Sequence, residues 1–123
     1  MKTVTTILIA LVAVEHLYFL VLEMFLWTAP IGLKTFGLTP EFAEQSASLA
    51  ANQGLYNGFL AAGLIWGAVK RENAFPIQAF FLSCVIVAGV FGAITVKTSI
   101  LYVQALPALV AFGFAALTRS RSL

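Results

Sequence analysis

The chain has 123 residues, of which 61% are hydrophobic and only 10% are charged. An average soluble domain is about 45–50% apolar and about 25% charged, and a small domain has a high surface-to-volume ratio that requires polar surface. The composition therefore excludes an ordinary soluble globular domain and indicates an integral membrane protein that contacts the lipid bilayer. The net charge of +2 is too small for a nucleic-acid-binding surface, so nucleic acid is not an expected partner.

Four apolar segments follow one another along the chain, at residues 4–27, 47–69, 75–96 and 100–117. A membrane helix needs about 20 residues, within a range of about 17–25, and each segment fits that range. The second helix begins at residue 47 or, with an interfacial first stretch, near residue 40, where Thr39, Pro40 and Glu41 form a helix-start sequence. Pro30 and Gly32 end the first helix and are expected to lie in a connection. The sequence predicts an all-α fold, a membrane-embedded four-helix bundle that forms a single transmembrane domain over residues 1–123.

The distribution of Lys and Arg predicts the orientation of these helices. Cytoplasmic loops carry an excess of Lys and Arg. In a four-span protein the two termini and the second connection share one side, which holds five cations, against two on the other side, Lys34 and Lys97. The five are Lys2, Lys70, Arg71, Arg119 and Arg121. Both termini are therefore expected to be cytoplasmic.

Ionisable side chains cluster on one face of the first helix. Glu15 and His16 lie near its middle, and Glu23 lies about 12 Å further along the axis, within an arc of about 100°. A charged residue at the centre of an inserted helix costs about 2.5–3.5 kcal/mol. This face is therefore expected to point into the bundle interior or a water-filled cavity.

The second helix carries a polar face at matching depths, because it runs in the opposite direction through the membrane. Asn52 and Gln53 share the depth of Glu23, and Asn57 shares that of Glu15. We expect these side chains to form a polar pocket in the outer half of the membrane. The candidate ligand-binding or proton-handling residues are Glu15, His16, Tyr18, Glu23, Asn52, Gln53, Tyr56, Asn57 and Gln104.

Small residues mark two further helix faces. Gly54 and Gly58 are four residues apart on the second helix, as are Ala88 and Gly92 on the third. Small residues at this spacing permit close helix approach in membranes. They predict contacts with a neighbouring helix, either within the chain or in a homo-oligomer.

The sequence gives little support for a metal-binding site or for a nucleophilic catalytic residue. Glu15 and His16 diverge by about 100° around the helix, and His16 and Glu23 are about 10 Å apart along it, so one ion would not reach all three. No metal or other cofactor is expected. Cys84 is the single cysteine, and neither it nor Ser83 has a base implied beside it.

Two blocks of sequence carry a resemblance to a known family. They are EHLYFLVLEMFLW at residues 15–27 and NQGLYNGFLAAGL at residues 52–64. The chain resembles the small bacterial four-helix integral membrane proteins of the domain-of-unknown-function family numbered 1304, over nearly its whole length. The resemblance implies a multi-pass protein of the bacterial inner (plasma) membrane, and it implies no activity.

Three functions stay open at this stage. We favour a pocket that binds or acts on a small amphipathic or lipid-like molecule, with Glu and His handling protons while Asn and Gln orient polar groups. One alternative is a proton-coupled small transporter that works as a homo-oligomer. The other is a structural or accessory membrane protein whose polar cluster only specifies packing. The sequence does not decide whether the protein is an enzyme.

Overall fold

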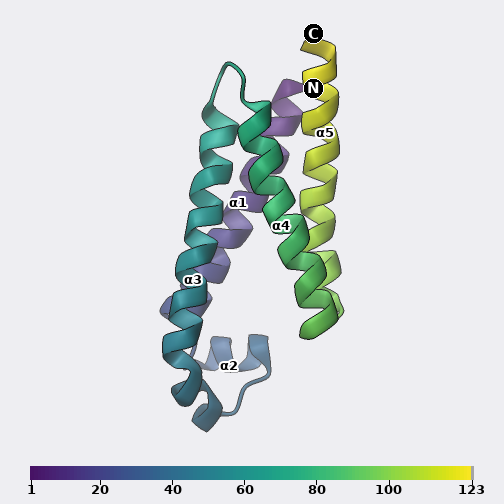
Figure 1. Ribbon diagram of the computed structural model, residues 1–123. Helices are drawn as coiled ribbons and strands as arrows, with labels where there is room; N and C mark the ends of the chain where they lie inside the picture. The colour runs from purple at the N-terminus through teal and green to yellow at the C-terminus, as the bar shows by residue number, and fades with distance from the viewer. Residues whose placement is uncertain (123) are drawn as a thin grey trace. The chain divides into compact units, whose positions relative to one another are not determined.

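The computed structural model describes residues 1–122, which form helices joined by short connections, with no strand in that range. The helices are α1 (Lys2–Met24), α2 (Pro30–Phe36), α3 (Pro40–Val69), α4 (Phe75–Thr95), the π-helical turn η1 (Leu101–Ala105) and α5 (Leu106–Ser122) (Figure 1). The predicted all-α class is confirmed.

The start of α3 shows why this helix is longer than its apolar segment. It begins at Pro40, whose fixed φ suits the first helical position. The backbone N–H of Phe42 donates a hydrogen bond to Oγ1 of Thr39 at 3.2 Å, so Thr39 caps the helix. The polar first turns of α3 are therefore helical by local capping, independently of hydropathy.

Helix α2 was not predicted and replaces part of the expected connection. Pro30 was expected only to end the first helix, but α1 already ends at Met24, and Pro30 stands at the first position of α2, where its missing N–H is not needed. Gly37 ends α2 in the left-handed conformation, with φ at +65°, and its N–H donates to the carbonyl oxygen of Leu33. Gly32 is buried, and a Cβ there would lie 2.0 Å from the carbonyl oxygen of Leu26, so only glycine fits.

Three helical segments are long and apolar enough to cross a membrane: α1, α4 and the continuous stretch Leu101–Ser122. The sequence predicted four such segments. Helix α3 has 30 residues and is long enough, but Asn52, Gln53 and Asn57 lower its hydropathy. The structure therefore has three such segments and not four because of the polar composition of α3, and not because of its length.

The chain divides into two compact units. The terminal unit comprises residues 1–13 and, within the described chain, 62–122, and the central unit comprises residues 14–61. Helices α1 and α3 contribute residues to both units.

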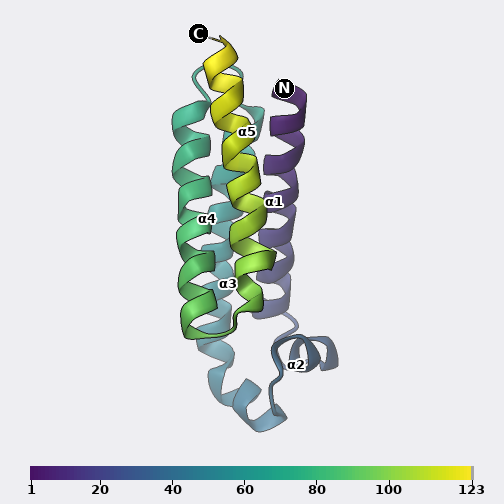
Figure 2. The ribbon, with the colours of Figure 1, turned by 90° about the vertical axis from the view of Figure 1, so that its right-hand side faces the viewer.

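In the terminal unit, α4 packs against η1 and α5, which follow it after a short turn (Figures 1 and 2). Gly89 permits this contact, since a Cβ there would lie 2.6 Å from the backbone nitrogen of Ala105. The Thr5 hydroxyl on α1 lies 2.6 Å from that of Thr118 on α5, and both lie within hydrogen-bonding distance of the Phe114 carbonyl oxygen. The buried apolar side chains that form this core are small or branched: Ile9, Val12, Ala13, Leu64, Leu82, Val85, Ala105, Ala108, Ala111 and Ala115.

The last turns of α3 join the terminal unit through a buried amide. Gln78 is 9% exposed, and its Nε2 donates a hydrogen bond to the carbonyl oxygen of Gly67 at 2.9 Å. A buried amide without a partner would cost free energy, so this hydrogen bond secures the end of α3 against the start of α4.

In the central unit, the second half of α1 packs against the middle of α3. A Cβ on Gly54 would lie 2.6 Å from Cγ of Met24 and 3.3 Å from the carbonyl oxygen of Leu20. Gly58 also faces Leu20. The prediction that these glycines contact a neighbouring helix is confirmed within the chain, so Gly54 is already covered by α1 and is not a free surface for a second copy.

Candidate functional site

The candidate site begins with two carboxyl groups on α1. Glu15 and Glu23 are eight residues apart, which places them about 80° apart around the helix and about 12 Å apart along it. Glu23 is 4% exposed and Glu15 is half-buried. Helix geometry thus presents both groups on one side of α1, in the central unit.

Helix α3 supplies a hydrogen-bond donor to Glu23, the more buried of these two carboxyl groups. Nδ2 of Asn57 donates to Oε1 of Glu23 at 2.5 Å. Gly54 lies one turn before Asn57, and a Cβ there would come within 3.2 Å of the Glu23 Cβ. The missing side chain at Gly54 therefore lets α3 approach α1 closely enough for Asn57 to reach the carboxyl.

Glu15 is placed differently. Its Oε1 atom is buried and accepts no hydrogen bond from residues 1–122. A carboxyl oxygen is an acceptor that in water is always hydrogen-bonded, and burying it without a donor costs about 1–3 kcal/mol. The site therefore holds one carboxyl with a donor and one buried acceptor oxygen without one.

His16 lies beside Glu15 in the chain and is fully buried. Its ring meets the ring of Phe19 edge-to-face, with 5.4 Å between centroids and 71° between planes. The spacing of three residues brings these rings onto one side of α1. The imidazole is thus fixed by packing within the helix that carries both carboxyls.

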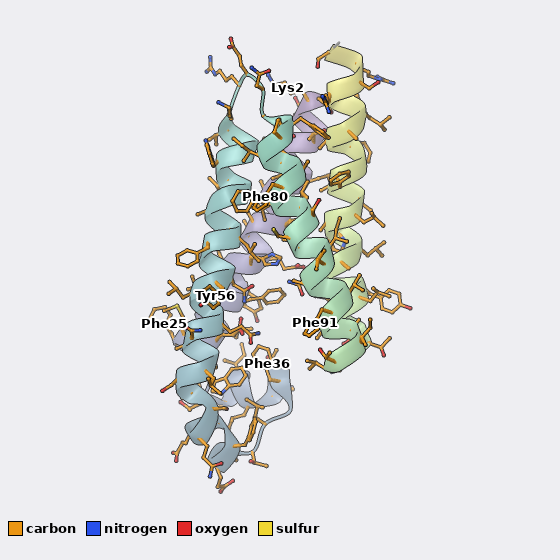
Figure 3. All side chains as sticks on the ribbon, in the orientation of Figure 1. Lys2, Phe25, Phe36, Tyr56, Phe80 and Phe91 are labelled. Atoms are coloured by element: carbon orange, nitrogen blue, oxygen red, sulfur yellow. The ribbon has the colours of Figure 1, made fainter. Side chains whose placement is uncertain are left out.

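Several predicted pocket residues lie on the surface of the described chain. Tyr18 and Tyr56 are 49% and 57% exposed, and Asn52 and Gln53 are also exposed (Figure 3 labels Tyr56). The expectation that this whole set faces the interior is therefore not met. Of the polar face predicted on α3, only Asn57 is half-buried and contacts a carboxyl of α1.

The helical periodicity of α3 explains this outcome. Gly54, Gly58 and Ala61 lie within about 60° of one another, and Asn52 and Tyr56 lie on the opposite side. Because the side with small residues packs on α1, the other side is left at the surface. Asn57 lies at the edge of the packed side, about 60° from Gly54, which lets its amide reach Glu23.

Gln104 belongs to the terminal unit, where it is half-buried on η1. Single π-helical turns occur frequently at functional sites, and none was predicted here. Sequence reasoning also passed over Gln78, although a lone amide in an apolar helix start was a usable signal. No group of three or more His, Cys, Asp or Glu residues that could hold a metal ion occurs in residues 1–122.

The sequence around this site matches a known family. The family described as "Protein of unknown function (DUF1304)" matches residues 10–116, a range that includes every candidate residue. The chain belongs to the DUF1304 family. It is similar to the uncharacterised protein YpaA of Lactococcus lactis subsp. lactis (strain IL1403), with 31% identity over 106 residues that cover 85% of this chain and 89% of the relative. No solved structure matches this DUF1304 protein.

Proposed function

We propose that this DUF1304 protein is a four-span protein of the bacterial plasma membrane that binds a small amphipathic molecule at the acidic site of its central unit. In this proposal Glu15, His16, Glu23 and Asn57 form the site, and both termini are cytoplasmic. The polar head group of the ligand donates a hydrogen bond to Glu15, and its apolar part lies among the apolar side chains of the membrane helices.

The course of the chain supports α3 as the fourth membrane-spanning helix. The contact between Thr5 and Thr118 brings the start of α1 and the end of α5 to the same end of the terminal unit. The guanidinium of Arg119 over the ring of Phe75 brings the start of α4 to that end as well. Helix α3, about 45 Å long, is long enough to cross a bilayer, and its last turns lie in the terminal unit directly before the loop into α4.

The distribution of cations supports the orientation. The end with both termini carries five of the seven Lys and Arg residues in a four-span arrangement, and such an excess is typical of the cytoplasmic side. The lower hydropathy of α3 is compatible with a span, because polar residues within membrane helices occur where they face protein or water.

One observation carries the ligand proposal: Oε1 of Glu15 is buried without a hydrogen-bond donor from residues 1–122. Glu23, on the same face, has Asn57 as its donor. A ligand with a hydroxyl or ammonium group would satisfy the Glu15 oxygen, and binding would recover the free energy of an unmade hydrogen bond. Donor-bearing head groups are therefore the class that this site selects.

The experiment compares two probes with the same alkyl chain, of which only one has a hydrogen-bond donor. The purified protein is titrated in detergent with 1-dodecanol, which has a hydroxyl group, and with its methyl ether, which has none. A ligand that binds only the folded state raises the melting temperature by mass action. We expect 1-dodecanol to raise it more than the ether does, and Glu15→Leu to abolish the difference.

A matched variant separates the site from general charge effects. Glu44 is exposed on α3, so Glu44→Leu should keep the full difference between the two probes. Equal shifts with 1-dodecanol and its ether in the wild-type protein would contradict ligand recognition by Glu15. A Glu15→Leu variant that keeps the difference while losing intrinsic stability would assign the cluster to packing alone.

A further inference from the structure

A cavity of about 320 Å³ opens at one end of the terminal unit. Its walls come from the first turns of α1, the end of α3, the loop into α4, the first turn of α4 and the last turns of α5. Figures 1 and 2 both show the two chain ends and the α3–α4 loop at this end, and Figure 3 shows Lys2 there, with Phe91 near the other end of α4. Ligand pockets in proteins measure about 300–1,000 Å³, so the cavity is large enough for a compact polar group.

The cavity concentrates the positive charge of the chain. Lys2, Lys70, Arg71 and Arg119 line it, which are four of the seven Lys and Arg residues, and no acidic side chain is among its lining residues. Glu72 in the same loop is exposed and does not line the cavity. The charge of the lining is therefore complementary to an anion.

Neighbouring contacts hold the walls in place. The Arg119 guanidinium lies 4.7 Å from the centroid of the Phe75 ring, which orients its planar face. The hydroxyls of Thr5 and Thr118 lie 2.6 Å apart, and Nε2 of Gln78 donates to the Gly67 carbonyl oxygen. Part of the cavity wall is thus organised by the fold, while all four of its cations, Lys2, Lys70, Arg71 and Arg119, have exposed side chains.

We propose that this cavity binds the phosphate of an anionic phospholipid head group. The cavity lies at the ends of α1, α4 and α5, and these segments are long and apolar enough to cross a membrane, so its level is that of the head groups. Guanidinium and ammonium groups are the side chains that pair best with phosphate. Basic pockets between transmembrane helices on the cytoplasmic side bind anionic head groups. This inference shares the membrane placement proposed above and is independent of the acidic site.

The experiment measures lipid binding to the full-length protein in detergent. Dioleoyl phosphatidylglycerol and dioleoyl phosphatidylcholine are titrated separately, and bound lipid is counted by native mass spectrometry. Each Lys or Arg near an anionic lipid surface contributes about 1 kcal/mol, or about five-fold in affinity. The variant with Lys70→Gln and Arg71→Gln is therefore expected to bind phosphatidylglycerol about 25-fold more weakly and phosphatidylcholine equally well.

Lys97→Gln is the matched control, because Lys97 is exposed in the same unit but does not line the cavity. It should leave phosphatidylglycerol binding unchanged. Unchanged helical circular dichroism and an unchanged melting temperature without lipid establish that the double variant is folded, as expected for two exposed side chains. If these values change, Lys70→Gln alone is tested, with an expected loss of about five-fold.

Two outcomes would overturn the proposal. Equal weakening by Lys97→Gln would show that total charge, and not the cavity, attracts the lipid. Competition by free glycerol 3-phosphate at the same concentration as the lipid would assign the cavity to a soluble phosphate compound. Selective phosphatidylglycerol binding that the double variant loses, with no competition by glycerol 3-phosphate, would support it.

Discussion

Replacing Gly89 with alanine should destabilise the terminal unit. The added Cβ would lie 2.6 Å from the backbone nitrogen of Ala105 and 2.9 Å from its Cα. Because the obstructing atoms belong to the backbone of η1, no change of side-chain rotamer relieves the contact. Helix α4 and the segment that contains η1 must therefore separate.

The expected size follows from overpacking, which costs about 1–3 kcal/mol in a well-packed core. Alanine also favours helix formation over glycine by up to about 1 kcal/mol, which would partly offset this cost. Gly113 on α5 provides the matched control, since a Cβ there would meet no atom within 4 Å. The difference between Gly89→Ala and Gly113→Ala cancels the contribution of helix propensity and should be about 1–3 kcal/mol.

The measurement is unfolding of the two variants and the wild type in detergent by titration with sodium dodecyl sulfate, followed by circular dichroism. We expect Gly89→Ala to unfold at the lowest denaturant fraction and Gly113→Ala to equal or exceed the wild type. A Gly89→Ala variant as stable as Gly113→Ala would refute the close contact between α4 and η1.

Two further predictions concern the acidic site and the topology. Asn57→Ala should lower the free energy of unfolding by about 0.6 kcal/mol and at most about 1.7 kcal/mol, the range of hydrogen bonds within membranes, because Glu23 loses its donor. The control is Asn52→Ala at an exposed position, which should change the free energy of unfolding by less than about 0.5 kcal/mol. Similar losses from both changes would contradict the hydrogen bond between Asn57 and Glu23. Green fluorescent protein should fluoresce when fused after Arg121, and alkaline phosphatase should be active when inserted beside Lys34; activity of the phosphatase at the C-terminus would contradict the proposed orientation.

The polar and the small-residue sides of α3 show where sequence reasoning stops. The sequence predicted both that Asn52, Gln53 and Tyr56 face a pocket and that Gly54 contacts a helix. One helix cannot turn both sides toward the same neighbour, and the structure places the small residues there. In a membrane, helix association depends on close packing because lipid tails are as apolar as the side chains they would replace, so hydropathy alone does not rank the two sides.

The acidic site could be predicted only in part, because some of its features depend on helix periodicity and others on how closely two helices approach. That Glu15 and Glu23 share one side of α1 follows from helix periodicity alone. That Asn57 is the donor to Glu23 depends on how closely α3 approaches through Gly54. The cations show the same division, since their excess near the termini was evident in the sequence while their convergence on one cavity was not.

The amino-acid sequence by itself determined the all-α class and the helix starts at Pro40 and Phe75, and its match over residues 10–116 determined the membership in the DUF1304 family. Long apolar runs can satisfy their backbone only as helices in lipid. A proline in the first turn marks both helix starts, with a side-chain cap from Thr39 at Pro40 and without a side-chain cap at Phe75. Helix α2 depended on more than local signals: Pro30 was expected to end a helix, whereas α1 ends at Met24 and Pro30 begins α2, whose Gly32 packs closely against the Leu26 carbonyl oxygen. Tertiary structure likewise decided which polar groups meet and which lie at the surface, since those outcomes depend on distances between residues that are remote in the chain.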